Sequence, residues 1–141
     1  QLYRPLLERG GRIAGVETRR PWQDLGTPER YRRAVLDFLF RGRPWRRRWR
    51  AAGARVEPGV RLGRVAVEAG AVVERGSRLR RTLLLPGARA GREAALANCL
   101  VGFDAHVPAG AEIAGQLITP ATGGEDGGSR VGDLVFTPLV A

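Results

Sequence analysis

VAVEAGAVVERGSRLRRTLLLPGARAGREAALANCLVGFDAHVPAGAEI, residues 65–113, is the stretch that decides the fold. Within it an aliphatic side chain returns about every six residues, and glycine or proline separates the short apolar runs. A period of six with one inward aliphatic residue is typical of a parallel β-helix, in which each hexapeptide forms one face of a triangular prism. About ten hexapeptides, over residues 56–118, predict between three and four coils. The expected inward positions, with one-residue slips at Val67 and Val101, are Val56, Leu62, Val67, Val73, Leu79, Leu85, Ala90, Leu96, Val101, Val107 and Ile113.

Stacking explains why such a sequence folds. Each inward side chain packs on its counterpart one coil away, and its burial stabilises the fold by about 1.5 to 3 kcal/mol. A single coil cannot bury its own core, so stability requires several coils together with a cap at the open end. We expect residues 119–141 to form this cap, with a loop at Gly123–Ser129 and a last strand at Leu134–Phe136.

A helix is predicted a short distance before the repeats. Thr27 occupies the N-cap position, Pro28 the first helical position and Glu29 the first turn, where a negative charge favours the positive end of the helix dipole. Nearer the start of the chain we expect a helix at 2–9 and a short strand at 12–18. The predicted buried face of the main helix has the i, i+3, i+4, i+7 spacing and consists of Tyr31, Ala34, Val35, Phe38 and Leu39.

Residues 42–55 form an arginine-rich and tryptophan-rich linker. Pro44 can open a short helix, and Trp45 and Trp49 would then lie one turn apart on the same side. Arginines that contact phosphates and indoles that stack on bases are also the features of a single-stranded nucleic-acid clamp. Because both tryptophans share one side of the predicted helix, we favour a helix that docks through one face over nucleic-acid binding.

Composition limits the class of protein. All 24 basic residues are arginine and the net charge is +10, of which seven positive charges lie at 41–55 with no acid among them. One cysteine, Cys99, excludes an internal disulfide and fits a reducing cytoplasm, and it is expected to point into the prism as a small apolar side chain. No apolar run approaches the roughly 18 residues that a membrane span needs. We therefore expect a cytoplasmic protein without membrane contact.

The segment WQDLGTPERY, residues 22–31, resembles a known family signature. It matches the W-x-D-x-G-T-P-E-x-Y pattern near the end of the catalytic domain of sugar-phosphate nucleotidylyltransferases, the NDP-sugar pyrophosphorylases. In many members a left-handed β-helix of hexapeptides follows, and residues 98–115, NCLVGFDAHVPAGAEIAG, resemble that appendage. The resemblance covers the chain up to about residue 120, and its first motif is the more specific part.

The resemblance implies a fold, a reaction and a metal. The fold is mainly β, a left-handed parallel β-helix preceded by a small α/β remnant of a nucleotidyltransferase catalytic domain. In the reaction, the phosphate of a sugar 1-phosphate attacks the α-phosphorus of an NTP, which gives an NDP-sugar and pyrophosphate. Asp24 matches the second of the two carboxylates that hold the family's Mg²⁺, so it is the expected catalytic and metal-binding residue. Guanosine with mannose is the pair that we favour.

The same resemblance predicts that this chain is inactive alone. The family's glycine-rich nucleotide loop and its first metal-binding aspartate would precede Gln1, and the chain lacks methionine, so we expect the C-terminal part of a longer enzyme. The expected parts are 1–41, the end of the catalytic domain; 42–55, the linker helix; 56–118, the β-helix; and 119–141, the cap and loop. By analogy with other β-helix proteins we expect a homo-oligomer.

Other interpretations stay open at this point. The chain could be a noncatalytic β-helix module for oligomerisation or regulation, with an inert catalytic remnant in which Asp24 only hydrogen-bonds its own turn. It could also be a hexapeptide acyltransferase with His106 as general base, because His106 is the only histidine. This last hypothesis lacks a partner carboxylate, and we expect His106 to be a solvated turn residue.

Overall fold

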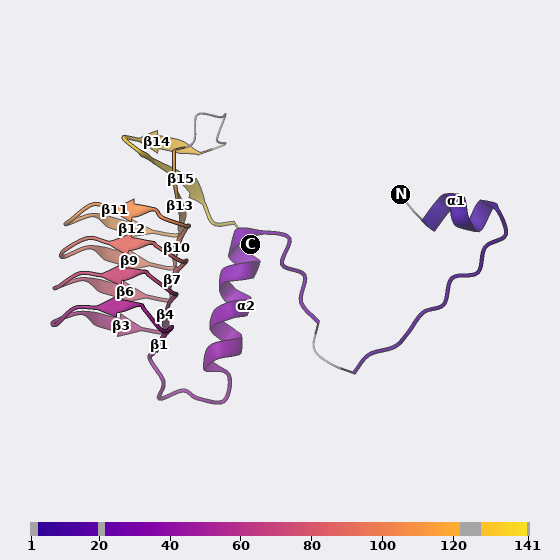
Figure 1. Cartoon of the computed structure of the whole chain (residues 1–141), viewed down its shortest axis with the longest axis horizontal. Coiled ribbons are helices and arrows are strands. Elements are labelled where there is room, and N and C mark those ends of the chain that lie inside the picture. Colours follow the sequence, from indigo (N-terminus) through magenta and orange to yellow (C-terminus); the bar gives the residue numbers. More distant parts are fainter. Residues whose placement is uncertain (1–2, 20–21, 122–127, 141) are drawn as a thin grey trace.

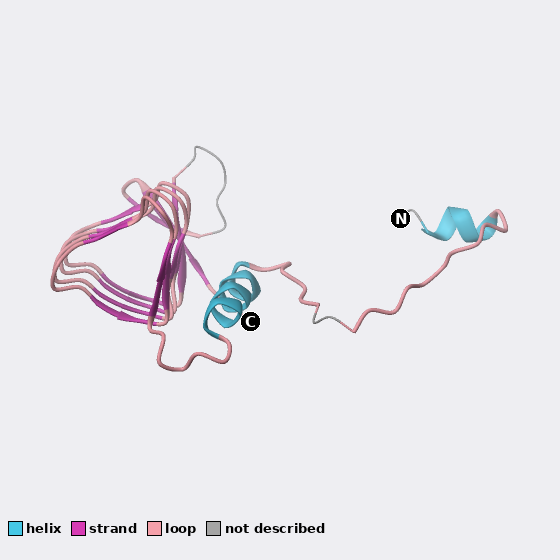
Figure 2. Cartoon of the chain, turned by 60° about the horizontal axis from the view of Figure 1, so that its bottom comes forward, coloured by secondary structure: helices cyan, strands magenta, loops and turns pink. Residues whose placement is uncertain are grey.

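The chain folds into a parallel β-solenoid of about four coils, with one long helix beside it (Figure 1). The computed structural model describes residues 3–19, 22–121 and 128–140. Viewed nearly along the stack, each coil has three sides, and every side contributes to one sheet (Figure 2). Sheet A has the order β1-β4-β7-β10-β13-β15-β14, sheet B the order β11-β8-β5-β2, and sheet C the order β12-β9-β6-β3.

The strands are short because each spans one side of a coil. Those of sheet A are β1 (Arg48–Arg50), β4 (Val65–Val67), β7 (Leu83–Leu84), β10 (Leu100–Val101), β13 (Gln116–Pro120), β14 (Ser129–Val131) and β15 (Leu134–Pro138). Those of sheet B are β2 (Arg55–Val56), β5 (Val72–Val73), β8 (Arg89–Ala90) and β11 (His106–Val107). Those of sheet C are β3 (Arg61–Gly63), β6 (Arg78–Arg80), β9 (Ala95–Ala97) and β12 (Glu112–Ala114).

Each coil contains 17 residues. Arg55 pairs with Val72 and Val72 with Arg89, and the same step of 17 joins the neighbouring strands of all three sheets. Inward positions therefore follow one another at intervals of six, five and six, so every coil has one short interval. The prediction of Leu85 as an inward residue was wrong for this reason, because Leu84 pairs with both Val67 and Val101.

The corners repeat with the coil as well. Residues with a positive φ occur at three places in each coil, where the chain turns from one side of the triangle to the next. Glycine adopts this conformation without steric cost, and Asn and Asp tolerate it better than most other residues. The three series are Gly53, Gly70, Gly87 and Asp104; Gly59, Gly76, Glu93 and Gly110; and Arg64, Arg81, Asn98 and Gly115.

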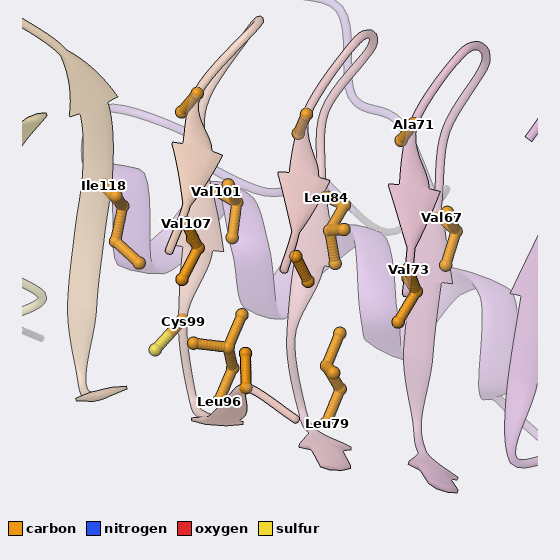
Figure 3. Packing of buried hydrophobic residues seen from close by; sticks show 14 of the residues in the cluster. Val67, Ala71, Val73, Leu79, Leu84, Leu96, Cys99, Val101, Val107 and Ile118 are labelled. Carbon is orange, nitrogen blue, oxygen red and sulfur yellow. The ribbon is translucent and has the colours of Figure 1, made fainter. Parts of the chain in front are cut away.

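The core fills the interior of the triangle (Figure 3). Leu79 and Leu96 stack in sheet C, and Val67, Leu84 and Val101 stack in sheet A, all almost completely buried. Two buried hydroxyl groups share this interior, and each donates to a backbone carbonyl, Ser77 Oγ to Gly91 O at 2.9 Å and Thr82 Oγ1 to Arg80 O at 3.0 Å. Cys99 is also fully buried, as predicted.

Helix α2 (Pro28–Phe40) covers the outer face of sheet A (Figure 2). Leu36 and Phe40 are its buried apolar residues, and they pack with outward side chains of the sheet such as Leu83 and Leu100. The predicted apolar face was rotated from the observed one, because Phe38 is 83% exposed and Arg32 is buried in its place. Tyr31, Val35 and Leu39 are half-buried at the edge of the contact.

The N-terminal expectations are partly confirmed. Helix α1 (Tyr3–Glu8) agrees with the prediction, but residues 12–18 form no strand and are all exposed. The linker helix predicted within 42–55 is absent, since Arg48–Arg50 is strand β1 and pairs in parallel with β4. The solenoid therefore begins at β1, earlier than residue 56, because Trp49 is paired with Ala66 across one coil.

An antiparallel hairpin ends the stack. Strand β15 pairs with β13, the last solenoid strand of sheet A, and with β14. Strand β15 contains the last strand predicted at Leu134–Phe136, while the role of residues 119–141 as a cap stays a prediction. The loop predicted at Gly123–Ser129 lies largely outside the described residues, apart from its last two positions. Within the described part of the chain, none of the helices has the length and apolar character required to cross a membrane.

Candidate functional site

The loop before α2 holds Asp24 through two of its own neighbours. The Asp24 Oδ1 atom accepts a hydrogen bond from the Gly26 backbone N–H at 3.0 Å, and Oδ2 pairs with the Arg30 guanidinium at 2.8 Å. Thr27 caps the helix as predicted, because its Oγ1 accepts from the Arg30 backbone N–H at 3.2 Å. The carboxylate is therefore fixed in direction by a turn and by the first turn of α2.

Asp24 nevertheless remains open to solvent on one side. Its side chain is 56% exposed, and an ionised carboxylate offers about four acceptor positions, of which the two contacts described here use two. It lies in a shallow hollow of about 280 Å³ with Arg33 and Asp37, while Asp37 itself pairs with Arg64 at 3.2 Å. The positive charge of Arg30 repels a cation at Asp24. A metal ion would therefore have to displace Arg30 from the carboxylate or bind the carboxylate beside it.

No group of three potential metal-ligating side chains occurs among the described residues. A Mg²⁺ ion keeps several waters and needs only one or two carboxylates together with phosphate oxygens. Asp24 alone therefore fits one ligand position of such a site.

Two other residues of the motif attach α2 to the solenoid. Glu29 holds the buried Arg32 through both carboxylate oxygens, at 2.7 and 2.8 Å, and Arg32 donates in turn to the Arg81 backbone carbonyl at a solenoid corner. Tyr31 is the second residue, half-buried at the edge of the contact with sheet A. Burial, and secondarily the charge of Glu68, raises the pKa of its phenol. Burial also raises the pKa of the Glu68 carboxyl. The sequence did not indicate that Arg32 pairs with Glu29 or that Arg30 pairs with Asp24, because both arginines have the pattern of ordinary solvated residues.

Large apolar side chains before, within and after α2 are exposed. Trp22 is 80% exposed, and Trp45 and Phe38 are also well exposed. Phe38 lines a second hollow, of about 610 Å³, together with Leu39, Trp49 and the arginines Arg41, Arg43 and Arg46.

The remaining candidates lie elsewhere. His106 is exposed on the outer face of β11 and forms no hydrogen bond or ion pair within the described residues. It is paired in register with Arg89, whose guanidinium contacts Glu74 at 3.4 Å, so no carboxylate is positioned on the imidazole. Burial raises the pKa of the Cys99 thiol, which disfavours the reactive thiolate. The structure thus separates Asp24, His106 and Cys99.

Comparison with known proteins adds no assignment. No protein-family model matches the chain, and a search of curated proteins finds no match.

Proposed function

We propose that this chain is the C-terminal part of a sugar-1-phosphate nucleotidylyltransferase, and that Asp24 contributes one ligand to its catalytic Mg²⁺. The substrates would be an NTP and a sugar 1-phosphate, with GDP-mannose as the favoured product, in a cytoplasmic homo-oligomer. The solenoid would then be a left-handed β-helix of the hexapeptide class, with one residue omitted from each coil. Alone, the chain would carry no activity.

The proposal rests on one observation: some residues of the motif have structural contacts, whereas Asp24 remains accessible to solvent. Thr27 and Glu29 build and anchor the helix, whereas the Asp24 carboxylate is half-exposed and Trp22, two residues earlier in the chain, is also exposed. An apolar surface of this kind suits the packing of a further domain. A phosphate-binding partner there would bring its own carboxylate and phosphate oxygens to the open side of Asp24.

One observation favours a second function, a noncatalytic assembly module. Both Asp24 oxygens already have partners, Gly26 N–H and Arg30, so the loop is complete without a metal. The motif would then persist only as the structure that begins α2 and holds it to the solenoid through Glu29 and Arg32.

The two functions separate in one assay on the full-length protein that carries this chain. The measurement is Mg²⁺-dependent pyrophosphate release from an NTP and a sugar 1-phosphate. We expect Asp24→Asn to lower kcat/KM by about 100-fold or more, because a metal ligand supplies several kcal/mol of transition-state stabilisation. Asp37→Asn is the matched control, since Asp37 is an equally exposed aspartate paired with an arginine in the same hollow.

Two outcomes oppose the first function. Wild-type turnover by the Asp24→Asn protein would remove the metal role. Absence of pyrophosphate release from the wild-type protein, with every NTP and sugar phosphate tried, would favour the assembly module.

A further inference from the structure

The outer face of sheet C differs in charge from the other two sides of the solenoid. On sheet A, the helix and apolar outward residues exclude water. On sheet B, outward arginines have acids beside them, Arg55 with Glu57 at 3.5 Å and Arg89 with Glu74 at 3.4 Å. On sheet C, by contrast, Arg61, Arg78 and Arg80 form no ion pair within the described residues.

Strand pairing places these three arginines close together. Arg61 and Arg78 are in register on neighbouring parallel strands, so their backbones are about 4.8 Å apart. Arg80 follows Arg78 on the same face of β6, about 7 Å along the strand, because Leu79 points inward between them. The nearest acid on the face, Glu112, lies two strands beyond Arg78, at about 10 Å. Three like charges therefore share a small area without compensation.

Small residues leave open space around the arginines. Gly63 is paired with Arg80 on one side, and Ala97 is paired with it on the other. A side-chain carbon at Gly63 would lie 3.7 Å from Arg80 Cγ, so glycine keeps that flank clear. The result is a hollow of about 630 Å³ along sheet C, with a floor that includes Ala95 and Ala97. The hollow is shallow and open to solvent, so a ligand would lie along the sheet.

We infer that this hollow binds a phosphoanhydride, either free pyrophosphate or the polyphosphate of a nucleotide. Guanidinium groups bind phosphate oxygens with two parallel hydrogen bonds, and three of them from one small area can contact two adjacent phosphates. An anion of this charge also relieves the repulsion among Arg61, Arg78 and Arg80. The site lies on sheet C, whereas Asp24 precedes the helix on sheet A, so it does not rest on the proposed catalytic role.

The test is calorimetric titration of this chain with pyrophosphate, ATP, AMP and sulfate. We expect saturable binding of pyrophosphate and ATP, and at least tenfold weaker binding of AMP and sulfate, because these offer only one tetrahedral anion. Tighter binding of ATP than of pyrophosphate would identify a nucleotide whose ring rests on the alanine floor. Equal affinities would identify the phosphoanhydride alone as the ligand.

Two double variants with the same charge change give the decisive contrast. Arg78→Gln with Arg80→Gln should weaken pyrophosphate binding at least tenfold, whereas Arg55→Gln with Arg89→Gln, which removes two arginines from sheet B, should leave it within twofold. An independent variant, Ala97→Glu, supplies an acid in register with Arg80 and should abolish binding while the fold persists.

The inference is overturned if pyrophosphate shows no saturable binding, if sulfate competes equally, or if the sheet B variant weakens binding as much as the sheet C variant. Asp24→Asn should leave pyrophosphate binding unchanged. Failure of the proposed enzyme function and failure of this site would therefore be observed separately.

Discussion

Sheets A and C are built on the same coil and have the same kind of inward residue, yet their outer faces have opposite character. On sheet A the outward positions include Leu83 and Leu100, which α2 covers. The corresponding surface of sheet C has Arg78 and Ala95 and nothing covers it among the described residues. The inward residues thus determine the solenoid, and the outward residues determine what each face can bind.

The largest loss of stability should come from a change in the interior core, which lies behind both sheets. Leu96→Ala removes a fully buried side chain from the stacked core and should lower the free energy of unfolding by about 2 to 5 kcal/mol. Chemical denaturation measures this change. His106→Ala, at an exposed outward position of sheet B, should alter stability by less than about 0.5 kcal/mol. Similar losses in the two variants would contradict the assignment of inward and outward positions.

A smaller effect should come from loosening the cover of sheet A. Leu36→Ala leaves a cavity between α2 and the sheet and should lower stability by about 2 to 3 kcal/mol. Hydrogen exchange should show earlier loss of protection in α2 than in the solenoid strands. Phe38→Ala, two residues away on the exposed side of the helix, should change neither quantity appreciably. If Phe38→Ala is the more destabilising variant, the described orientation of α2 is wrong.

The smallest effect concerns Glu68, an acid that follows strand β4 of the covered sheet. Burial raises the pKa of Glu68, so the folded chain keeps a proton at pH values where the unfolded chain has released it. Glu68 therefore contributes stability at low pH that is lost as the pH rises past the ordinary pKa of a glutamate. Glu68→Gln should make the fall in unfolding free energy over this window shallower.

The measurement is urea denaturation at a series of pH values. The wild-type protein at the same pH values is the reference. An unchanged slope in Glu68→Gln would show that this carboxyl titrates alike in the folded and unfolded chain.

The sequence was sufficient for the solenoid because inward aliphatics and corner glycines are local and repeat. It was insufficient for the details that depend on contacts between coils. A constant interval of six residues predicted Leu85 as the inward residue. The strand register instead requires one interval of five in each coil, which makes Leu84 the inward residue. Trp45 and Trp49 had helical spacing, but pairing of Trp49 with Ala66 makes that segment a strand.

The orientation of α2 and the surroundings of Asp24 could not be predicted from the hydropathy pattern, because both depend on pairs of charged side chains. The helix has two possible buried faces, and the observed one contains Arg32, which a hydropathy pattern assigns to solvent. Only the pair with Glu29 and the corner carbonyl of Arg81 makes that burial favourable. The metal-binding role of Asp24 rests on the family resemblance and stays a prediction.

The constant coil of 17 residues constrains how this protein can change in length. A loss or gain of one whole coil would return every corner glycine and every inward aliphatic to an equivalent place, so the stack would only become shorter or taller. A change of a few residues within a coil would instead put polar side chains into the interior of all later coils. Length variation among relatives should therefore occur in steps of a complete coil, or be confined to the hairpin that closes the stack.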